Sequence, residues 1–149
     1  MAPEQDEIAS ELIARSPLSL LVIEAADRLD DIRRAWQELE TRVGLRGRRF
    51  YGVVNIPTGI YWAGTTMHAD DPPDRFGLET HELAGGTYAR SVLQGGPPGI
   101  YDAIGRTVQR LLATVDVDRS RNVVEFYKRH DTIELWCPCH DPQRMRTQT

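Results

Sequence analysis

The order strand, helix, hairpin occurs twice in this chain of 149 residues, and this repeat limits the possible folds more than any other feature. In the first copy, the short apolar run at residues 18–25 predicts a strand. A helix is predicted next, with Asp27 placed to cap it and Gly44 to end it. Its apolar residues recur at helical spacing: Ile32, Trp36, Leu39 and Val43. The segments 50–56 and 60–67 then predict a hairpin, which completes a βαββ unit.

The second copy begins with a long extended segment, residues 77–93, in which Gly85-Gly86 predicts a bulge or bend. A helix follows Pro98, and its apolar face is formed by Ile100, Ile104, Val108, Leu111 and Leu112. The hairpin at residues 123–139 completes this unit. Together the units predict an α+β fold, in which tandem βαββ repeats form one antiparallel sheet. Both helices are expected on one face and a ligand cleft on the other.

One domain is expected at this length, because such a chain buries roughly 70% of its unfolded surface without disulfides. We place it at residues 17–139, with the two units at about 17–68 and 77–139. Residues 140–149 are expected to form a disordered tail. Residues 1–16 are polar and are expected to form a loose arm or a short helix, because three apolar residues there have helical spacing: Ile8, Leu12 and Ile13.

The final hairpin places charged residues where a strand pair is usually apolar. Because side chains alternate between the faces of a strand, Glu125 and Tyr127 share the face opposite Phe126. On the second strand, Glu134 and Trp136 lie opposite the apolar series Ile133, Leu135 and Cys137. We therefore expect one face to be core and the other to place carboxylates beside aromatic rings. Such a surface is suited to cationic or aromatic small molecules.

The charge balance and the hydropathy pattern exclude several classes of partner. A net charge of −4 and a pI near 5.5 argue against a general nucleic-acid binder. We interpret the basic cluster Arg46, Arg48 and Arg49 as a solvated loop rather than an anion site. No apolar run approaches the roughly 20 residues that span a bilayer, and the N-terminal residues lack a signal-peptide pattern. A cytoplasmic location, with no membrane contact, is therefore expected.

The cysteines and histidines do not predict a metal centre. Cys137 and Cys139 are separated by one proline, so a disulfide between them would be strained. With His130 and His140 they could hold a metal, but none of the usual paired spacings of a zinc site is present. We expect reduced structural thiols, no metal and no cofactor. His81 has no visible partner and is interpreted as a polar strand residue rather than a catalytic one.

Four motifs occur in an order that is typical of one known family: His81-Glu82-Leu83-Ala84-Gly85-Gly86-Thr87-Tyr88 at a strand, Gly95-Gly96 before a helix, Glu125-x-Tyr127, and Ile133-Glu134-Leu135-Trp136-Cys137-Pro138. Over roughly residues 17–139 the chain resembles the GyrI-like small-molecule-binding domain, the effector-binding domain of AraC- and MerR-type multidrug regulators, in its stand-alone form. Its ending, Cys137-Pro138-Cys139, departs from the aliphatic-Pro-aliphatic pattern of that family. No helix-turn-helix region precedes the domain, so direct DNA binding is not expected.

The resemblance implies a pocket for hydrophobic, often cationic compounds, built around a glutamate, and a bacterial role in sensing or sequestering a drug or toxin. Glu125 matches the family's glutamate, and the aromatic cage would comprise Tyr127, Trp136, Tyr101, Tyr51 and Tyr61. A carboxylate within an apolar strand must be paired, hydrated or protonated, since unpaired burial costs several kcal/mol. An exposed glutamate on an edge strand is the alternative. Glu134 is expected either to partner Glu125 or to lie at the rim.

An enzymatic function is the second hypothesis, because some stand-alone members of this family are hydrolases that open the cyclopropane of DNA-alkylating antibiotics. Glu125 would then be the base, and Tyr127 or Tyr101 the proton donor, without a cofactor. A second carboxylate, Glu82 or Glu134, would raise the pKa of the base. Whether the protein is an enzyme stays open. A protein partner is possible, because the family is named after a gyrase-inhibiting member, but nothing in the sequence indicates one.

Overall fold

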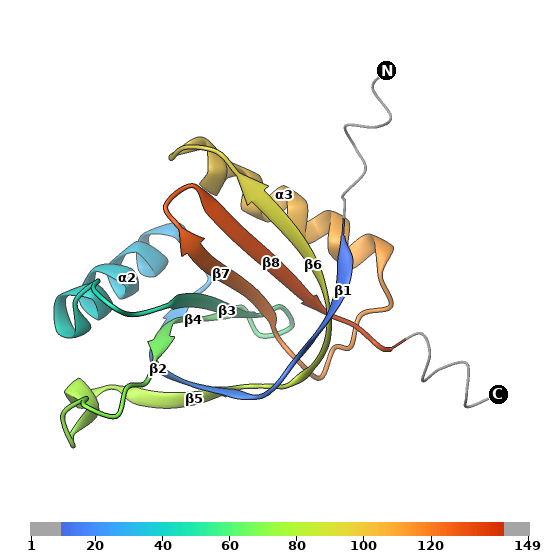
Figure 1. Cartoon of the computed structure of the whole chain (residues 1–149). Coiled ribbons are helices and arrows are strands. Elements are labelled where there is room, and N and C mark those ends of the chain that lie inside the picture. Colours follow the sequence, from blue (N-terminus) through green and yellow to red (C-terminus); the bar gives the residue numbers. More distant parts are fainter. Residues whose placement is uncertain (1–9, 142–149) are drawn as a thin grey trace.

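The computed structural model describes residues 10–141, and these form one antiparallel sheet of eight strands with two long helices (Figure 1). The first half contains β1 (Glu11–Arg15), β2 (Leu18–Ala26), α2 (Leu29–Val43), β3 (Phe50–Asn55) and β4 (Ile60–Thr66). The second half contains the short 3-10 helix η1 (Arg75–Gly77), β5 (Glu79–Leu83), β6 (Gly86–Gln94), α3 (Gly99–Thr114), β7 (Val123–Arg129) and β8 (Thr132–Pro138). The predicted fold class, α+β with tandem βαββ units in one sheet, is confirmed.

The two units meet at the centre of the sheet, where β3 pairs with β7. The strand order is β1-β6-β8-β7-β3-β4-β2-β5, so β3, β4 and β2 of the first unit mirror β7, β8 and β6 of the second. A pseudo-twofold axis therefore passes between β3 and β7. At this axis Gly52 is paired with Glu125, and each is the third residue of its strand.

The two edges of the sheet are joined by long, bent strands, which makes the sheet curl. β1 runs into β2 and β5 runs into β6, and Figure 1 shows the two bends side by side. β1 pairs with β6 and β2 pairs with β5, in one continuous antiparallel register. The bend leaves no room for a side chain at Gly85, where a Cβ would lie 2.7 Å from Pro17 and 2.9 Å from the Arg15 carbonyl oxygen. The predicted interruption at Gly85-Gly86 is thus the bend between β5 and β6.

The N-terminal segment differs from the prediction. Residues 11–15, expected to form part of a loose arm or short helix, are strand β1. Their helical spacing of apolar residues is overridden by pairing with β6, which satisfies the backbone groups of both strands. The remainder of the expected arm, residues 1–9, and the expected tail beyond residue 141 lie outside the described residues.

Both helices pack on the same face of the sheet and share one core with it. α2 buries Ala35 and Leu39 against this face, and α3 buries Ile100, Val108 and Leu111. Gly44 ends α2 with a positive φ of 76°, as predicted. Asp27 does not cap the helix, because α2 begins at Leu29 and its N-cap residue, Arg28, makes no side-chain capping bond.

The opposite face, called the open face below, carries a second core of aromatic and aliphatic side chains enclosed by the curled sheet: Leu20, Val22, Tyr51, Val53, Leu83, Tyr88, Val124 and Trp136. Alternation along each strand sends one set of side chains to the helices and the other set to this core. Within the described residues, neither helix is long and apolar enough to cross a membrane.

Candidate functional site

Glu125 lies in the middle of the sheet on the face that carries the helices. Its neighbours across the sheet are Gly52 on β3 and Leu135 on β8. Paired residues of an antiparallel sheet point to the same face, and Leu135 belongs to the core beneath the helices. Only 8% of Glu125 is exposed to solvent. A buried carboxylate at the sheet centre therefore needs an explanation.

Two phenols satisfy one oxygen of this carboxylate. The hydroxyls of Tyr61 on β4 and Tyr127 on β7 both donate to Glu125 Oε1, at 2.8 and 2.7 Å. The indole of Trp36 on α2 donates to the Tyr61 hydroxyl oxygen at 3.1 Å. A chain of hydrogen bonds thus runs from α2 through β4 to β7, and we call Glu125, Tyr61, Tyr127 and Trp36 the acidic cluster.

Aromatic rings pack within the acidic cluster and against it. The ring of Trp36 meets that of Tyr127 edge to face, with centroids 5.3 Å apart, and that of Phe50 at 6.1 Å. Edge-to-face contacts of this kind are among the preferred arrangements of aromatic pairs. A desolvated cation near these rings would be attracted by about 2 kcal/mol per well-placed face.

The charge of Glu125 has no cationic partner among residues 10–141. None of the ion pairs formed within that range includes it. Burial raises the pKa of Glu125, the hydrogen bonds from Tyr127 and Tyr61 oppose this rise, and the negative charge of Asp27 adds to it. Burial and the Glu125 charge hold the pKa values of Tyr61 and Tyr127 well above their usual value, so both stay neutral donors.

The predicted site residues are divided between the two faces of the sheet. Glu125, Tyr127 and Tyr61 come together as described. Tyr101, in the first turn of α3, is 48% exposed and hydrogen-bonds to none of them. Tyr51 and Trp136 belong to the core of the open face. Glu125 thus lies on the helix face, whereas the ligand cleft was expected opposite the helices.

The reason for this division is the register of the last hairpin. A four-residue turn at 128–131, as the sequence suggests, would pair Glu125 with Glu134. The observed turn is His130-Asp131, with an irregularity between Tyr127 and Arg129, so that Glu125 pairs with Leu135. A register shift of one residue moves a side chain to the other face. Glu134 and Trp136 consequently point away from Glu125.

Glu134 forms a separate, charge-compensated cluster on the open face. Its Oε1 accepts a hydrogen bond from the indole of Trp136 at 3.0 Å and lies 3.5 Å from Arg90 Nη1, while its Oε2 lies 3.5 Å from Lys128 Nζ. The side chain is 5% exposed. Glu134 is therefore neither a rim charge nor a partner of Glu125, and the other suggested carboxylate, Glu82, is exposed on β5.

The rings of the open face pack mainly on one another. Tyr51 stacks on Phe126 with centroids 4.8 Å apart, and Trp136 contacts both rings. The guanidinium of Arg15 covers Trp136 at 5.0 Å. His81 stacks on Trp62 at 4.5 Å, and burial lowers its pKa. These residues form the second core. Tyr51 and Trp136 therefore do not take part in the expected cage around Glu125.

Trp36 of the acidic cluster and the neighbouring Phe50 were not among the site residues predicted from the sequence, in which Trp36 was assigned to the apolar face of a helix. Both do pack against the core beneath the helices. Trp36 recurs at the spacing of the apolar stripe of α2, so periodicity does not distinguish it from a purely structural residue. The available signal was its indole N–H, which needs a partner when it is buried.

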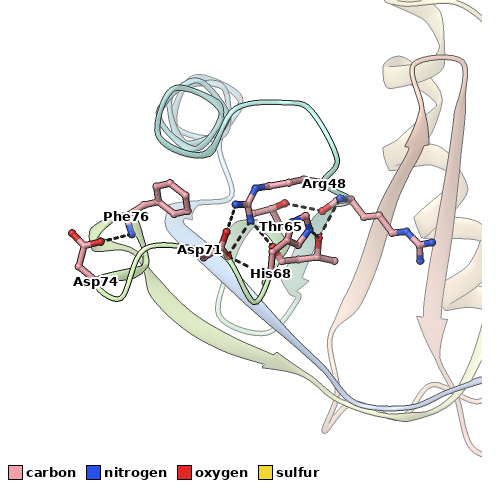
Figure 2. A network of polar contacts seen from close by, with 8 residues as sticks. Arg48, Thr65, His68, Asp71, Asp74 and Phe76 are labelled. Atoms are coloured by element: carbon pink, nitrogen blue, oxygen red, sulfur yellow. Dashed lines mark hydrogen bonds and ion pairs between the residues drawn. The ribbon is translucent and has the colours of Figure 1, made fainter.

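One group of potential metal ligands lies in the loop after β4, and one of its carboxylates is paired with a cation of the protein. Ligand atoms of His68, Asp70 and Asp71 lie within 4.8 Å of one another. Figure 2 shows the polar network there, in which Asp71 forms an ion pair with Arg48 and accepts a hydrogen bond from the backbone N–H of His68 at 2.8 Å. Hydrogen bonding to Arg48 lowers the pKa of Asp71. The carboxylate is thus committed to a cation of the protein.

Arg48 itself corrects the interpretation of the basic cluster as a solvated loop. Its side chain is 7% exposed, donates to the Thr66 carbonyl oxygen at 2.9 Å and lies over the ring of Phe76 at 5.3 Å. Arg48 therefore connects the segment between the two units to the residues just before β3.

Cys137 and Cys139 are both reduced and buried. Burial raises the pKa of Cys137 to about 11, so this thiol stays protonated at neutral pH.

The sequence matches no protein-family description and no curated protein. Solved structures do match the fold. The integron cassette protein VCH_CASS2 from the mobile metagenome of Vibrio cholerae has a TM-score of 0.70 at 14% identity, over 88% of this chain and 95% of that one. SAV2435, solved bound to tetraphenylphosphonium, has a TM-score of 0.68 at 14% identity, over 95% of this chain and 100% of its own.

A third similar structure is a putative bacterial transcription regulation protein from Staphylococcus aureus MU50. It has a TM-score of 0.60 at 14% identity, over 91% of this chain and 100% of that one. At such identities the likeness establishes the fold and not the activity. The fold is thus shared with a protein solved bound to tetraphenylphosphonium and with one described as a putative transcription regulation protein.

Proposed function

We propose that this protein binds lipophilic, aromatic cations at the acidic cluster, in the manner of a stand-alone GyrI-like domain, for sensing or sequestration of a drug or toxin. The observation that carries the proposal is the environment of Glu125. It is a buried carboxylate that receives hydrogen bonds only from neutral phenols and has no cation of the described chain beside it.

The energetics of such a site favour positive charge without demanding one particular ligand. A buried, unpaired carboxylate costs several kcal/mol, and a bound cation removes part of that cost. Aromatic walls contribute through burial, at roughly 25 cal/mol per Å² of apolar area, whatever the detailed shape of the ligand. Trp36, Phe50 and Tyr127 supply these walls. The ligand is therefore selected by its charge and its rings.

Access requires a rearrangement of side chains, because Glu125 is buried beneath Trp36 and its neighbours. Trp36 and Phe50 are themselves only partly buried. We propose that Phe50 changes rotamer to admit the ligand, which then takes the place of its ring contact with Trp36. Rotation of partly exposed side chains requires no change in the sheet.

Tetraphenylphosphonium is the appropriate first probe, since a protein of the same fold binds it. Isothermal titration should give measurable binding to the wild type and at least about tenfold weaker binding to Glu125→Gln, the scale of one charge-assisted contact. Triphenylphosphine oxide, which is aromatic and neutral, should bind both proteins equally. Glu134→Gln is the matched control, because it removes a buried carboxylate from the opposite face.

Equal binding of the cationic and the neutral compound by the wild type would overturn the proposal. So would an affinity for the cation that falls as much in Glu134→Gln as in Glu125→Gln. The two variants remove the same group from one sheet, and only the helix face is proposed to hold the ligand.

Hydrolysis of an electrophilic, cyclopropane-bearing compound is a second proposal, favoured by the closeness of a carboxylate to two phenols. Glu125 would take a proton from water, which attacks a cyclopropane carbon. The carbon–carbon bond then breaks, and its electron pair moves to the conjugated carbonyl oxygen, which Tyr127 would protonate. In the structure Tyr127 donates to Glu125 instead, so it would first have to turn. Mass spectrometry decides: a compound that gains the mass of one water with the wild type, but not with Glu125→Gln, indicates the enzyme.

A further inference from the structure

Gly52 lies directly opposite Glu125 on the pseudo-twofold axis of the sheet. The two residues are paired across β3 and β7, at equivalent positions of the two units. One unit carries a carboxylate at this position and the other carries no side chain. The duplicated fold is therefore asymmetric at its centre.

The space beside Gly52 is occupied by the polar atoms of the acidic cluster. A Cβ atom at this position would lie 2.5 Å from Glu125 Oε1 and 2.8 Å from Tyr61 Cζ, and closer still to the Tyr61 hydroxyl oxygen. These separations are shorter than carbon atoms tolerate in a packed core. With any other residue at position 52, Tyr61 or Glu125 would have to move.

The backbone gives no competing reason for a glycine here. Gly52 is not among the glycines of the described chain with positive φ, and it lies within a regular stretch of β3. Glycine in the interior of a strand weakens that strand and usually marks a close approach. The approach in this case is that of the Tyr61 hydroxyl and the Glu125 carboxylate.

Tyr61 has little freedom to yield. It is 2% exposed, belongs to the core beneath the helices, and accepts a hydrogen bond from Trp36. Glu125 is held from a second side by Tyr127. Added volume at position 52 would therefore break the bond between Tyr61 and Glu125 rather than shift the whole cluster.

We propose that Gly52 is a positioning residue of the cation site, whose missing side chain lets Tyr61 and Glu125 meet at the centre of the sheet. This inference rests on the proposed function for its biological meaning. Its physical content, that Gly52 places Glu125 through Tyr61, is independent of any ligand. It also gives position 52 control of ligand selection, since a displaced carboxylate no longer faces the aromatic walls.

The first test compares Gly52→Ala with Gly64→Ala. Gly64 lies on β4, and a Cβ there would point at the side chains of Leu20 and Val22, 3.2 and 3.3 Å away on the open face. Both variants thus add a methyl group to the same unit of the sheet. Gly52→Ala should weaken tetraphenylphosphonium binding at least about tenfold, and Gly64→Ala should leave it within about threefold.

A ligand-free measurement accompanies this comparison, namely titration of the Glu125 carboxyl carbon by NMR. Gly52→Ala should move its midpoint upward if Tyr61 is displaced and downward if the carboxylate is pushed toward solvent. Gly64→Ala should not move it. A purely structural role for Gly52 would lower the melting temperature and leave the midpoint unchanged, and that result would overturn the proposal.

A second test holds even where Gly52→Ala alone fails to fold. Tyr61→Leu removes both the Cζ atom and the hydroxyl that crowd position 52. In this background Gly52→Ala should lower the melting temperature far less than in the wild type, which would establish the coupling by a double-mutant cycle. An equal loss in both backgrounds would overturn the proposal. If the wild type fails to bind tetraphenylphosphonium while the coupling is observed, the proposed function fails and the positioning role stands.

Discussion

The two faces of the sheet each bury one glutamate, and the protein satisfies the two carboxylates in different ways. Glu134, on the open face, lies within 3.5 Å of Arg90 and Lys128 and accepts a hydrogen bond from Trp136. Glu125, on the helix face, accepts hydrogen bonds from two neutral phenols instead. The first carboxylate is compensated within the chain, whereas the second has no cationic partner among residues 10–141.

One small sheet thus contains two buried glutamates in different electrostatic environments, of which only Glu125 is proposed to bind a ligand. Removing one partner of a buried ion pair leaves an uncompensated charge, which costs about 3–5 kcal/mol. Removing the charge of a carboxylate that has no counter-ion relieves a cost instead. Glu134→Gln should therefore lower the free energy of unfolding more than Glu125→Gln does. Glu125→Gln, in turn, should lower the ligand affinity more than Glu134→Gln does.

The largest effect is expected on the open face. Glu134→Gln should lower the free energy of unfolding by about 3 kcal/mol at neutral pH, because Arg90 would keep its charge beside a neutral amide. Urea denaturation measures this change. Glu11→Gln is the matched control, since Glu11 also pairs with Arg90 but its side chain is 61% exposed, and it should cost less than about 1 kcal/mol. Equal losses in the two variants would mean that burial does not distinguish the pairs.

A smaller effect, with a defined dependence on pH, is expected at Glu125. Its pKa is raised in the folded protein, so the folded state binds more protons than the unfolded state at pH values above 4.5, the ordinary value of the carboxyl. The stability of the wild type should therefore fall relative to Glu125→Gln as the pH rises from that value through the folded pKa. Each unit of difference between the two pKa values corresponds to about 1.4 kcal/mol.

The pKa of Asp118 is shifted in the direction opposite to that of Glu125. Hydrogen bonds from Ser120 and Arg121 lower its pKa from 3.8 to about 2. Ionised Asp118 therefore contributes its full stabilisation at pH values above 3.8, its pKa in the unfolded chain, and this contribution is lost as the pH falls toward 2. Unfolding experiments from pH 3 to 7 should give difference curves of opposite slope for Glu125→Gln and Asp118→Asn. Curves of the same slope would show that burial of the Glu125 carboxylate does not destabilise the folded protein.

The sequence predicted the elements of this fold closely, because each carries a periodic pattern or a turn residue. The stripe from Ile32 to Val43 is helix α2, Gly44 ends it, and Gly85 marks the bend between β5 and β6. β1 was missed because its pairing is with β6, far along the chain, and a local pattern contains no information about such a partner.

The site was predicted only in part, for a reason that lies in one turn. Alternation correctly placed Glu125 with Tyr127 and Glu134 with Trp136, but it does not relate one strand to the next. That relation depends on the turn at His130-Asp131 and on the irregularity after Tyr127, which together shift the register by one residue. Gly52 was visible as a glycine inside a strand, which signals a close approach, but its partners come from β4 and β7.

The smallest effects concern the two indoles that donate hydrogen bonds to the two clusters. Trp136 donates to the Glu134 carboxylate on the open face, and Trp36 donates to the Tyr61 hydroxyl on the helix face. Hydrogen bonds to charged groups contribute about 1.5–3 kcal/mol, and those between neutral groups about 1 kcal/mol. Beyond the cost of the smaller ring, which both share, Trp136→Phe should therefore destabilise the protein more than Trp36→Phe.

Ligand binding should reverse this order, and the reversal is the sharper part of the prediction. Trp36→Phe keeps an aromatic wall but frees the Tyr61 hydroxyl, so that Tyr61 is positioned by Glu125 alone. We expect a loss of about tenfold in tetraphenylphosphonium affinity, close to 1.4 kcal/mol, with no loss in Trp136→Phe. Urea denaturation and titration of the same two preparations measure both orders. If the same variant shows the larger loss in both stability and affinity, the two faces act as one core. The proposed distinction between the compensated Glu134 and the uncompensated Glu125 would then fail.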